Sequence, residues 1–145
     1  MSFANRIETP AQDRVGFPIS SAAIALAGRI LMSAIFLISV AGKLTAPSGT
    51  IGYIASAGLP FPQAAYAIAV LVELLGGLAL IAGYHTRIAA AALAVFSVAA
   101  AFGFHNNLAD QNQFYHFFKN VAIAGGLLQI VAFGAGGLSV DARRR

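Results

Sequence analysis

The sequence contains no cysteine and very little charge. Without thiols, this chain alone cannot form disulfides, thiolate metal sites, iron–sulfur clusters or a dithiol redox pair. Charged residues make up 10% of its 145 residues, whereas a soluble domain carries about 25%. A P-loop, a GxGxxG motif and a nucleophile triad are also absent. A chain with so few charges cannot cover a water-facing surface, so we expect a membrane protein.

Long apolar runs fill most of the remaining sequence. Each has close to the roughly 20 residues that a bilayer-spanning helix requires. The segment 44–62 is too polar and too rich in proline and glycine to cross, and it predicts a short interfacial helix at about 48–57. We therefore expect an all-α fold, a four-transmembrane-helix antiparallel bundle with a short interfacial helix between spans 1 and 2. The bundle would cover residues 20–137, with spans at about 20–42, 63–83, 88–104 and 114–134.

The basic residues predict how the bundle is oriented. Lysine and arginine concentrate in loops on the cytoplasmic side. Arginines occur in the polar N-terminal segment 1–19, in the turn at Arg87 and in the basic tail 138–145. Both termini and that turn should therefore be cytoplasmic. The net charge of +4 comes largely from the tail, and because no basic stripe with interleaved aromatics exists, nucleic acid is not an expected partner.

Two opposite charges interrupt the apolar runs. Glu73 lies near the middle of the second span, and Arg29 lies inside the first. At about 1.5 Å of rise per residue, Arg29 lies about 12–14 Å from the cytoplasmic start of its span and Glu73 about 15 Å from the outer start of its own. Leaving either unpaired in hydrocarbon costs at least about 2.5–3.5 kcal/mol, so we expect them to pair. Such a pair either serves a function or only fixes helix packing.

Three further polar residues gather toward the predicted outer face. Lys43, His105 and Lys119 end or begin three different spans, and with Glu73 below them they would form an outward-opening pocket. Two lysines and a histidine favour an anion, a lipid phosphate or a quinone oxygen. The alternative is that the lysines only extend into the headgroups and that His105 is an interfacial hydrogen-bonding residue. His105 and His116 lie at loop ends with only Asp110 nearby, so we expect no metal or haem site.

These residues occur in an order that resembles the DoxX family, a family of small four-helix bacterial membrane proteins. The resemblance covers about residues 25–141. It rests on Gly28-Arg29, Gly42-Lys43-Leu44 with Pro47, Gly58-Leu59-Pro60, Glu73-x-x-Gly-Gly-x-x-Leu, Gly83, Thr86-Arg87, His105, Lys119, Gly125-Gly126-Leu127-Leu128, and Gly134 through Asp141. The family is named for a subunit of a membrane quinone oxidoreductase. The resemblance implies a multi-pass protein of the bacterial inner membrane, and it marks Arg29, Lys43, Glu73, His105 and Lys119 as family-pattern polar positions.

Three functional hypotheses follow from the residues and the resemblance. The first is an accessory or quinone/anion-binding subunit of a membrane redox system, without a redox centre of its own and not catalytic alone. The second is a non-enzymatic membrane assembly factor or scaffold. The third is a small transporter or channel gated at the Arg29–Glu73 layer, which would need to oligomerise. The expected partners are the lipid bilayer and either a membrane redox protein or further copies of the chain.

Overall fold

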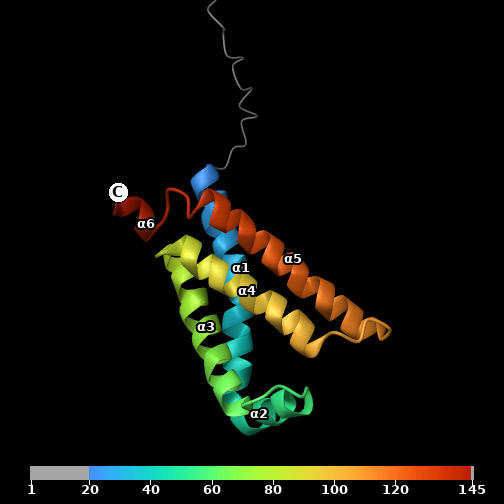
Figure 1. Cartoon of the computed structure of the whole chain (residues 1–145). Coiled ribbons are helices and arrows are strands. Elements are labelled where there is room, and N and C mark those ends of the chain that lie inside the picture. The colour runs from blue at the N-terminus through green and yellow to red at the C-terminus, as the bar shows by residue number, and fades with distance from the viewer. Residues whose placement is uncertain (1–19, 145) are drawn as a thin grey trace, which may run out of the picture.

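The computed structural model describes residues 20–144, and all regular structure in this part of the chain is helical (Figure 1). Four helices are long and apolar enough to cross a membrane. The predicted all-α fold, with four spans and a short helix between the first two, is therefore confirmed. The N-terminal segment 1–19 lies outside the described residues. The helices are α1 (Ser21–Thr45), α2 (Pro47–Ser56), α3 (Pro62–Ala82), α4 (Thr86–Phe104), α5 (Gln111–Phe133) and α6 (Val140–Arg143).

The four long helices pack as two hairpin-like pairs that meet along α3 and α4. Helix α1 packs against α3, α4 packs against α5, and α3 contacts α4. Helix α2 lies across one end of the bundle, where Tyr53 stacks on Phe104 with 5.3 Å between ring centroids. Figure 1 shows the start of α1, the α3–α4 turn and α6 together at the opposite end. The two ends of the bundle are therefore built from different segments of the chain.

Local sequence explains where the helices begin and end. Ser20 caps α1, because its hydroxyl accepts a hydrogen bond from the Ala23 N–H at 3.2 Å. Asp110 caps α5 in the same way through the Gln113 N–H at 2.9 Å. Helix α3 begins at Pro62, whose fixed φ suits a first turn. It ends at Ala82, and the next residue, Gly83, has a φ of 68°, a left-handed conformation that glycine adopts without strain.

The core is narrow and the outer surface is apolar. Buried residues from α1, α3, α4 and α5 form one cluster of Phe36, Leu80, Ala90, Leu93, Ala94, Ala124 and Leu127. Large apolar side chains cover the outside as well, and Leu31, Val95 and Phe133 are 74%, 71% and 81% exposed. Exposed apolar surface of this extent would aggregate in water but is the expected surface in a bilayer.

Two adjacent glycines let α3 lie between its neighbours. A Cβ added at Gly76 would be 2.7 Å from Cγ of Leu93 on α4, and one at Gly77 would be 2.9 Å from Cδ2 of Leu37 on α1. Small residues allow this kind of close approach between membrane helices. The approach brings the backbones of α1 and α4 close to α3 on the turns that follow Glu73.

Candidate functional site

Glu73 forms an ion pair inside the bundle, and its partner is Lys43. The Lys43 ammonium lies 2.8 Å from Oε2 and 3.1 Å from Oε1 of Glu73. Ser39, one turn before Lys43 on α1, joins both groups: its Oγ accepts from Lys43 at 2.5 Å and donates to Oε1 of Glu73 at 3.0 Å. We call Ser39, Lys43 and Glu73 the Lys43 cluster. Beside it, the Tyr66 hydroxyl donates to the Lys43 carbonyl oxygen at 3.3 Å.

The direction of helical side chains explains why this pair forms. Side chains on a helix point toward that helix's N-terminus. Lys43 is near the C-terminal end of α1, so its ammonium points back into the span instead of outward to water. Glu73 lies on the antiparallel α3, so its carboxylate points toward the α2 end and meets it. The side chains are 19% and 5% exposed, respectively, so the pair is largely buried while Lys43 stays partly accessible.

The predicted pairing of Arg29 with Glu73 is wrong. Nη1 of Arg29 donates to the carbonyl oxygens of Leu80 at 2.8 Å and Ile81 at 3.1 Å. Leu80 is seven residues beyond Glu73, which is about 10 Å along the helix. The sequence-based estimate compared the depths of the two backbones and left out side-chain direction. Arg29 points toward the start of α1, away from Glu73. The Arg29–Glu73 layer that a channel gate would need is therefore not formed.

Arg29 instead links three segments at the end of the bundle opposite α2. The last carbonyl groups of a helix lack partners within the helix, and they carry partial negative charge. The guanidinium of Arg29, 1% exposed, satisfies two of these carbonyls on α3 and also donates through Nη2 to the Leu138 carbonyl after α5. All of these acceptors are main-chain oxygens, so the described contacts of Arg29 serve packing.

His105 and Lys119 belong to a second polar group at the ends of α4 and α5. Nδ1 of His105 lies 2.9 Å from Oε1 of Gln113, and its ring stacks on His116 at 5.0 Å between centroids. Nζ of Lys119 lies 2.9 Å from Nδ1 of His116. Within residues 20–144, no hydrogen bond or ion pair joins this group to the Lys43 cluster. That same part of the chain has no group of three histidine, aspartate or glutamate residues placed to hold a metal ion.

Sequence reasoning missed the role of Asp141. Its carboxylate accepts from the backbone N–H groups of His85 and Thr86, each at 2.9 Å, and from the Thr86 hydroxyl at 2.7 Å. Its own N–H donates to the Gly83 carbonyl at 2.8 Å. The predicted tail 138–145 thus contains α6, which packs on the α3–α4 turn. The sequence did contain a signal for this helix. Ser139 is a residue type that often caps helices, and it is followed by Asp141, an acidic residue just before the three arginines of the tail.

These hydrogen bonds also change the acidity of Asp141. They stabilise the ionised carboxylate, and the pKa of Asp141 lies below its ordinary value, chiefly because the Thr86 N–H donates to it. The same carboxylate satisfies two N–H groups at the start of α4 that have no partner inside the helix. Asp141 is therefore a helix cap contributed by a segment distant in sequence.

Comparison with known proteins settles the family. The DoxX family profile matches residues 24–106, a stretch that contains Arg29, Lys43, Glu73 and His105. The chain belongs to the DoxX family. It is 37% identical over 116 residues to inner membrane protein YqjF of Escherichia coli K12, covering 80% of this chain and 88% of that protein. It is 33% identical over 123 residues to inner membrane protein YphA of the same organism, covering 81% and 88%.

No solved structure matches the chain at a significant level. The family, the two inner-membrane relatives and the four apolar helices together define this DoxX protein as a multi-pass inner-membrane protein.

Proposed function

We propose that this DoxX protein is an accessory subunit of a membrane redox system and binds the head of a quinone at the Lys43 cluster. The observation that supports this most is the direction of Lys43. A lysine two residues from the end of its helix can reach headgroups and water at little cost, yet this one extends inward to Glu73. The chain thus holds a charge pair at membrane depth, where ionisable residues usually mark functional sites.

The chemistry of the cluster suits a quinone carbonyl. The Lys43 ammonium has three donors, which now contact the Ser39 hydroxyl and the two carboxylate oxygens of Glu73, and a quinone oxygen would replace one of these acceptors. The Ser39 hydroxyl and the Lys43 ammonium are adjacent to the carboxylate, which balances the positive charge when no ligand is present. With no cysteine, the chain supplies no thiol, so the proposed role is to bind and position, with catalysis by a partner.

The test measures quinone retention by the purified protein in nanodiscs, with decylubiquinone as the probe and native mass spectrometry as the readout. Lys43→Met should lower retention about tenfold or more, because a hydrogen bond from a charged donor contributes about 1.5–3 kcal/mol. Glu73→Gln keeps the shape of the side chain and should weaken retention less. Lys119→Met removes the same charge from an exposed lysine on α5 and should leave retention unchanged.

A melting curve for each variant separates binding from folding. A folded Lys43→Met protein that retains as much quinone as the wild type would contradict the proposal. If Lys43→Met lowers the melting temperature too far for binding to be measured, Ser39→Ala provides a second test, because it removes one donor and leaves the ion pair in place. Unchanged retention in Ser39→Ala and in Glu73→Gln would also count against a quinone site at the cluster.

A second candidate is a non-enzymatic scaffold, and the exposure of α5 favours it. In the most apolar stretch of α5, only 11% of the residues are buried by the rest of the chain, against 22–28% in the other three spans. A helix so little covered by its own chain offers a face to a partner protein or to another copy. If quinone retention proves independent of Lys43, loss of partner or self-association on changing exposed α5 residues such as Val121 or Leu128 would support the scaffold.

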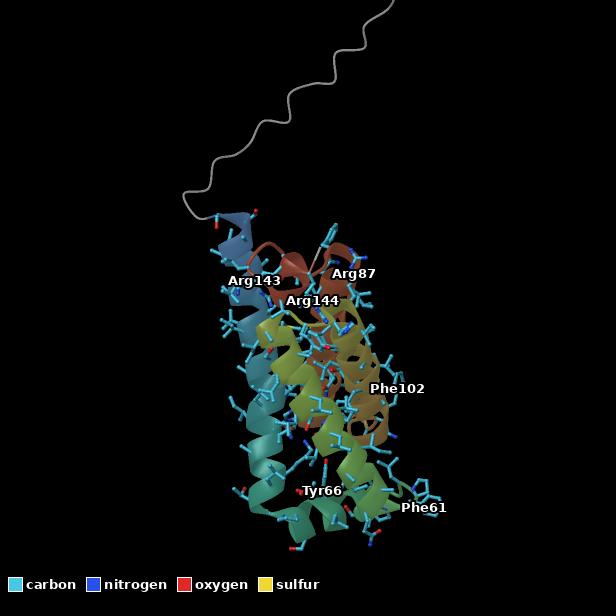
Figure 2. All side chains as sticks on the ribbon, turned by 90° about the vertical axis from the view of Figure 1, so that its left-hand side faces the viewer. Phe61, Tyr66, Arg87, Phe102, Arg143 and Arg144 are labelled. Carbon is cyan, nitrogen blue, oxygen red and sulfur yellow. The ribbon has the colours of Figure 1, made fainter. Side chains whose placement is uncertain are left out.

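We also propose that residue 20, α6 and the α3–α4 turn face the cytoplasm. These segments lie at one end of the bundle, together with Arg87, Arg143 and Arg144, which fits the positive-inside rule (Figure 2). Cysteines introduced at Arg144 and at Asn107 should be labelled from opposite sides of the membrane. Labelling of Arg144→Cys from outside would reverse the orientation.

A further inference from the structure

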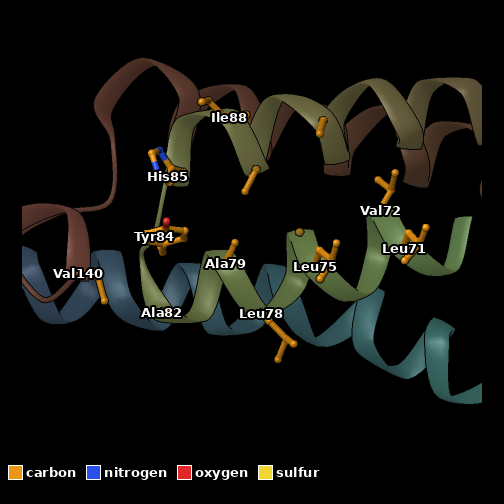
Figure 3. A pocket seen from close by; sticks show the side chains of 13 residues that line it. Leu71, Val72, Leu75, Leu78, Ala79, Ala82, Tyr84, His85, Ile88 and Val140 are labelled. Atoms are coloured by element: carbon orange, nitrogen blue, oxygen red, sulfur yellow. The ribbon is translucent and has the colours of Figure 1, made fainter. Parts of the chain in front are cut away.

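An apolar groove runs along the outside of the bundle between α3 and α4 (Figure 3). It has a volume of about 690 Å³. Leu71 and Leu75 line its inner part, Ala92 contributes from α4, and Tyr84 and His85 close one end. From Leu71 to Tyr84 the groove follows 13 residues of α3 and its turn, or about 20 Å. One leaflet of the hydrocarbon core is about 15 Å thick, so the groove has the length of an acyl chain.

A second, more polar cavity lies next to the groove at its Tyr84 end. This cavity has a volume of about 600 Å³ and shares His85 and Ile88 with the groove. Arg87 and Arg144 line it, and the Arg144 guanidinium lies 5.1 Å above the Tyr84 ring. The apolar groove therefore lies next to a cavity lined by two arginines that come from different segments of the chain.

The charge of this polar cavity is set by the two arginines. Asp141 also lines it, but its two oxygens already accept three hydrogen bonds from His85 and Thr86. Guanidinium groups present several donors in a planar fork that matches the oxygens of a phosphate. Arg87 and Arg144 are exposed and have no hydrogen bond or ion pair to other side chains among residues 20–144, which leaves their donors free for a ligand.

We propose that the groove and the polar cavity together bind one anionic phospholipid. One acyl chain lies between α3 and α4, and the phosphate contacts Arg87 and Arg144. The order of the two cavities matches the order of the lipid, with chain inward and headgroup at the basic end of the bundle. The proposed phosphate position lies at the opposite end of the bundle from Lys43. The inner end of the groove, at Leu71 and Leu75, is level with Glu73 on α3, but the groove and the polar cavity share no residue with the Lys43 cluster. The lipid site therefore uses other side chains than the proposed quinone site, and either one can fail without the other.

The first test measures which lipid the protein retains. The protein is placed in nanodiscs of equal parts phosphatidylglycerol and phosphatidylcholine, and lipids that stay bound after transfer to detergent are counted by native mass spectrometry. Phosphatidylglycerol should be retained in preference. Arg144→Gln and Arg87→Gln should each lower its retention about fivefold, because a basic side chain at an anionic lipid surface contributes about 1 kcal/mol.

A matched control tests whether position matters beyond total charge. Arg143→Gln makes the same change one residue away, at a side chain that lines neither cavity. It should leave retention near the wild-type value. Equal losses in Arg143→Gln and Arg144→Gln, or equal retention of the two lipids by the wild type, would overturn the proposal and leave only general attraction to the membrane surface.

A second pair of variants tests the acyl-chain part of the site. Ala92→Phe places a ring in the groove, whereas Ala99→Phe adds the same ring to an exposed position of α4 that does not line it. Ala92→Phe should reduce the retained lipid, and Ala99→Phe should not. Both melting temperatures are measured alongside, since neither residue is buried and both variants should fold. If Ala92→Phe retains as much lipid as Ala99→Phe, the groove does not hold the chain.

Discussion

At the scale of single residues, the two buried basic side chains have different kinds of partner. Arg29 donates to main-chain carbonyls at the end of α3, whereas Lys43 contacts the Glu73 carboxylate. The hydrogen bonds of Arg29 all go to main-chain carbonyl groups, so they link segments of the chain. The Lys43–Glu73 pair brings two charged side chains together, and Lys43 stays 19% exposed, so a ligand can reach it. Arg29 is 1% exposed and bound to carbonyl groups, so we place the quinone head at Lys43.

Asp141 gives a pH-dependent prediction at the same scale. Its folded pKa is below its ordinary value of about 3.9, so its stabilising effect is complete above that value and is lost as the pH falls through the folded pKa. Asp141→Asn should therefore lower the free energy of unfolding by about 1 kcal/mol at neutral pH, as for loss of a helix cap.

Melting curves in detergent at a series of pH values measure this effect. The gap between Asp141→Asn and the wild type should close as the medium is acidified through the folded pKa. Asp141→Asn removes the charge and keeps a side chain of the same size, so packing is matched. A gap that stays constant down to strongly acidic pH would show that the ionised carboxylate is not what stabilises the α3–α4 turn.

At the scale of elements, α3 determines the packing, because it contacts both α1 and α4. The sequence predicted the four spans to within three residues at each end, since long apolar runs and proline and glycine boundaries are local signals. The exact first and last residues of each helix depend on capping residues, which a hydropathy pattern does not show. Helix α5 starts at Gln111 because Asp110 caps it, and α1 continues to Thr45, past the predicted end at 42. Ser139 and Asp141 signal the start of a helix, but α6 has only four residues, too few for a pattern that predicts where it packs.

The glycines of α3 give the element-scale prediction. Gly76→Ala and Gly77→Ala place a methyl group against Leu93 and Leu37, and each should destabilise the bundle by about 1–3 kcal/mol through overpacking. Gly125→Ala is the control, because nothing lies within 4 Å of its added Cβ. It should be neutral or slightly stabilising. Thermal unfolding in one detergent compares all three, and equal effects of Gly76→Ala and Gly125→Ala would argue against close α3–α4 packing.

At the scale of the whole molecule, the two ends of the bundle have different tasks. The end with α6 joins distant segments through Arg29 and Asp141 and carries the headgroup part of the proposed lipid site. The other end carries the Lys43 cluster, with α2 across its mouth. The sequence predicted one outer pocket formed by Lys43, His105 and Lys119 above Glu73, but the structure joins only Lys43 to Glu73, and His105 and Lys119 belong to a separate group with His116. The sequence-based prediction assigned the wrong partner to Glu73, because backbone depth alone omits the several ångströms by which a long side chain extends along its helix.

The pairing of Glu73 with Lys43 is tested most directly by reversing the charges and measuring thermal unfolding. Glu73→Lys alone places two positive groups together and should cost about 3–5 kcal/mol, the range for breaking a buried pair. Adding Lys43→Glu should restore most of the lost stability, whereas adding Arg29→Glu to Glu73→Lys should lower it further. Rescue by Arg29→Glu, or none by Lys43→Glu, would contradict the account.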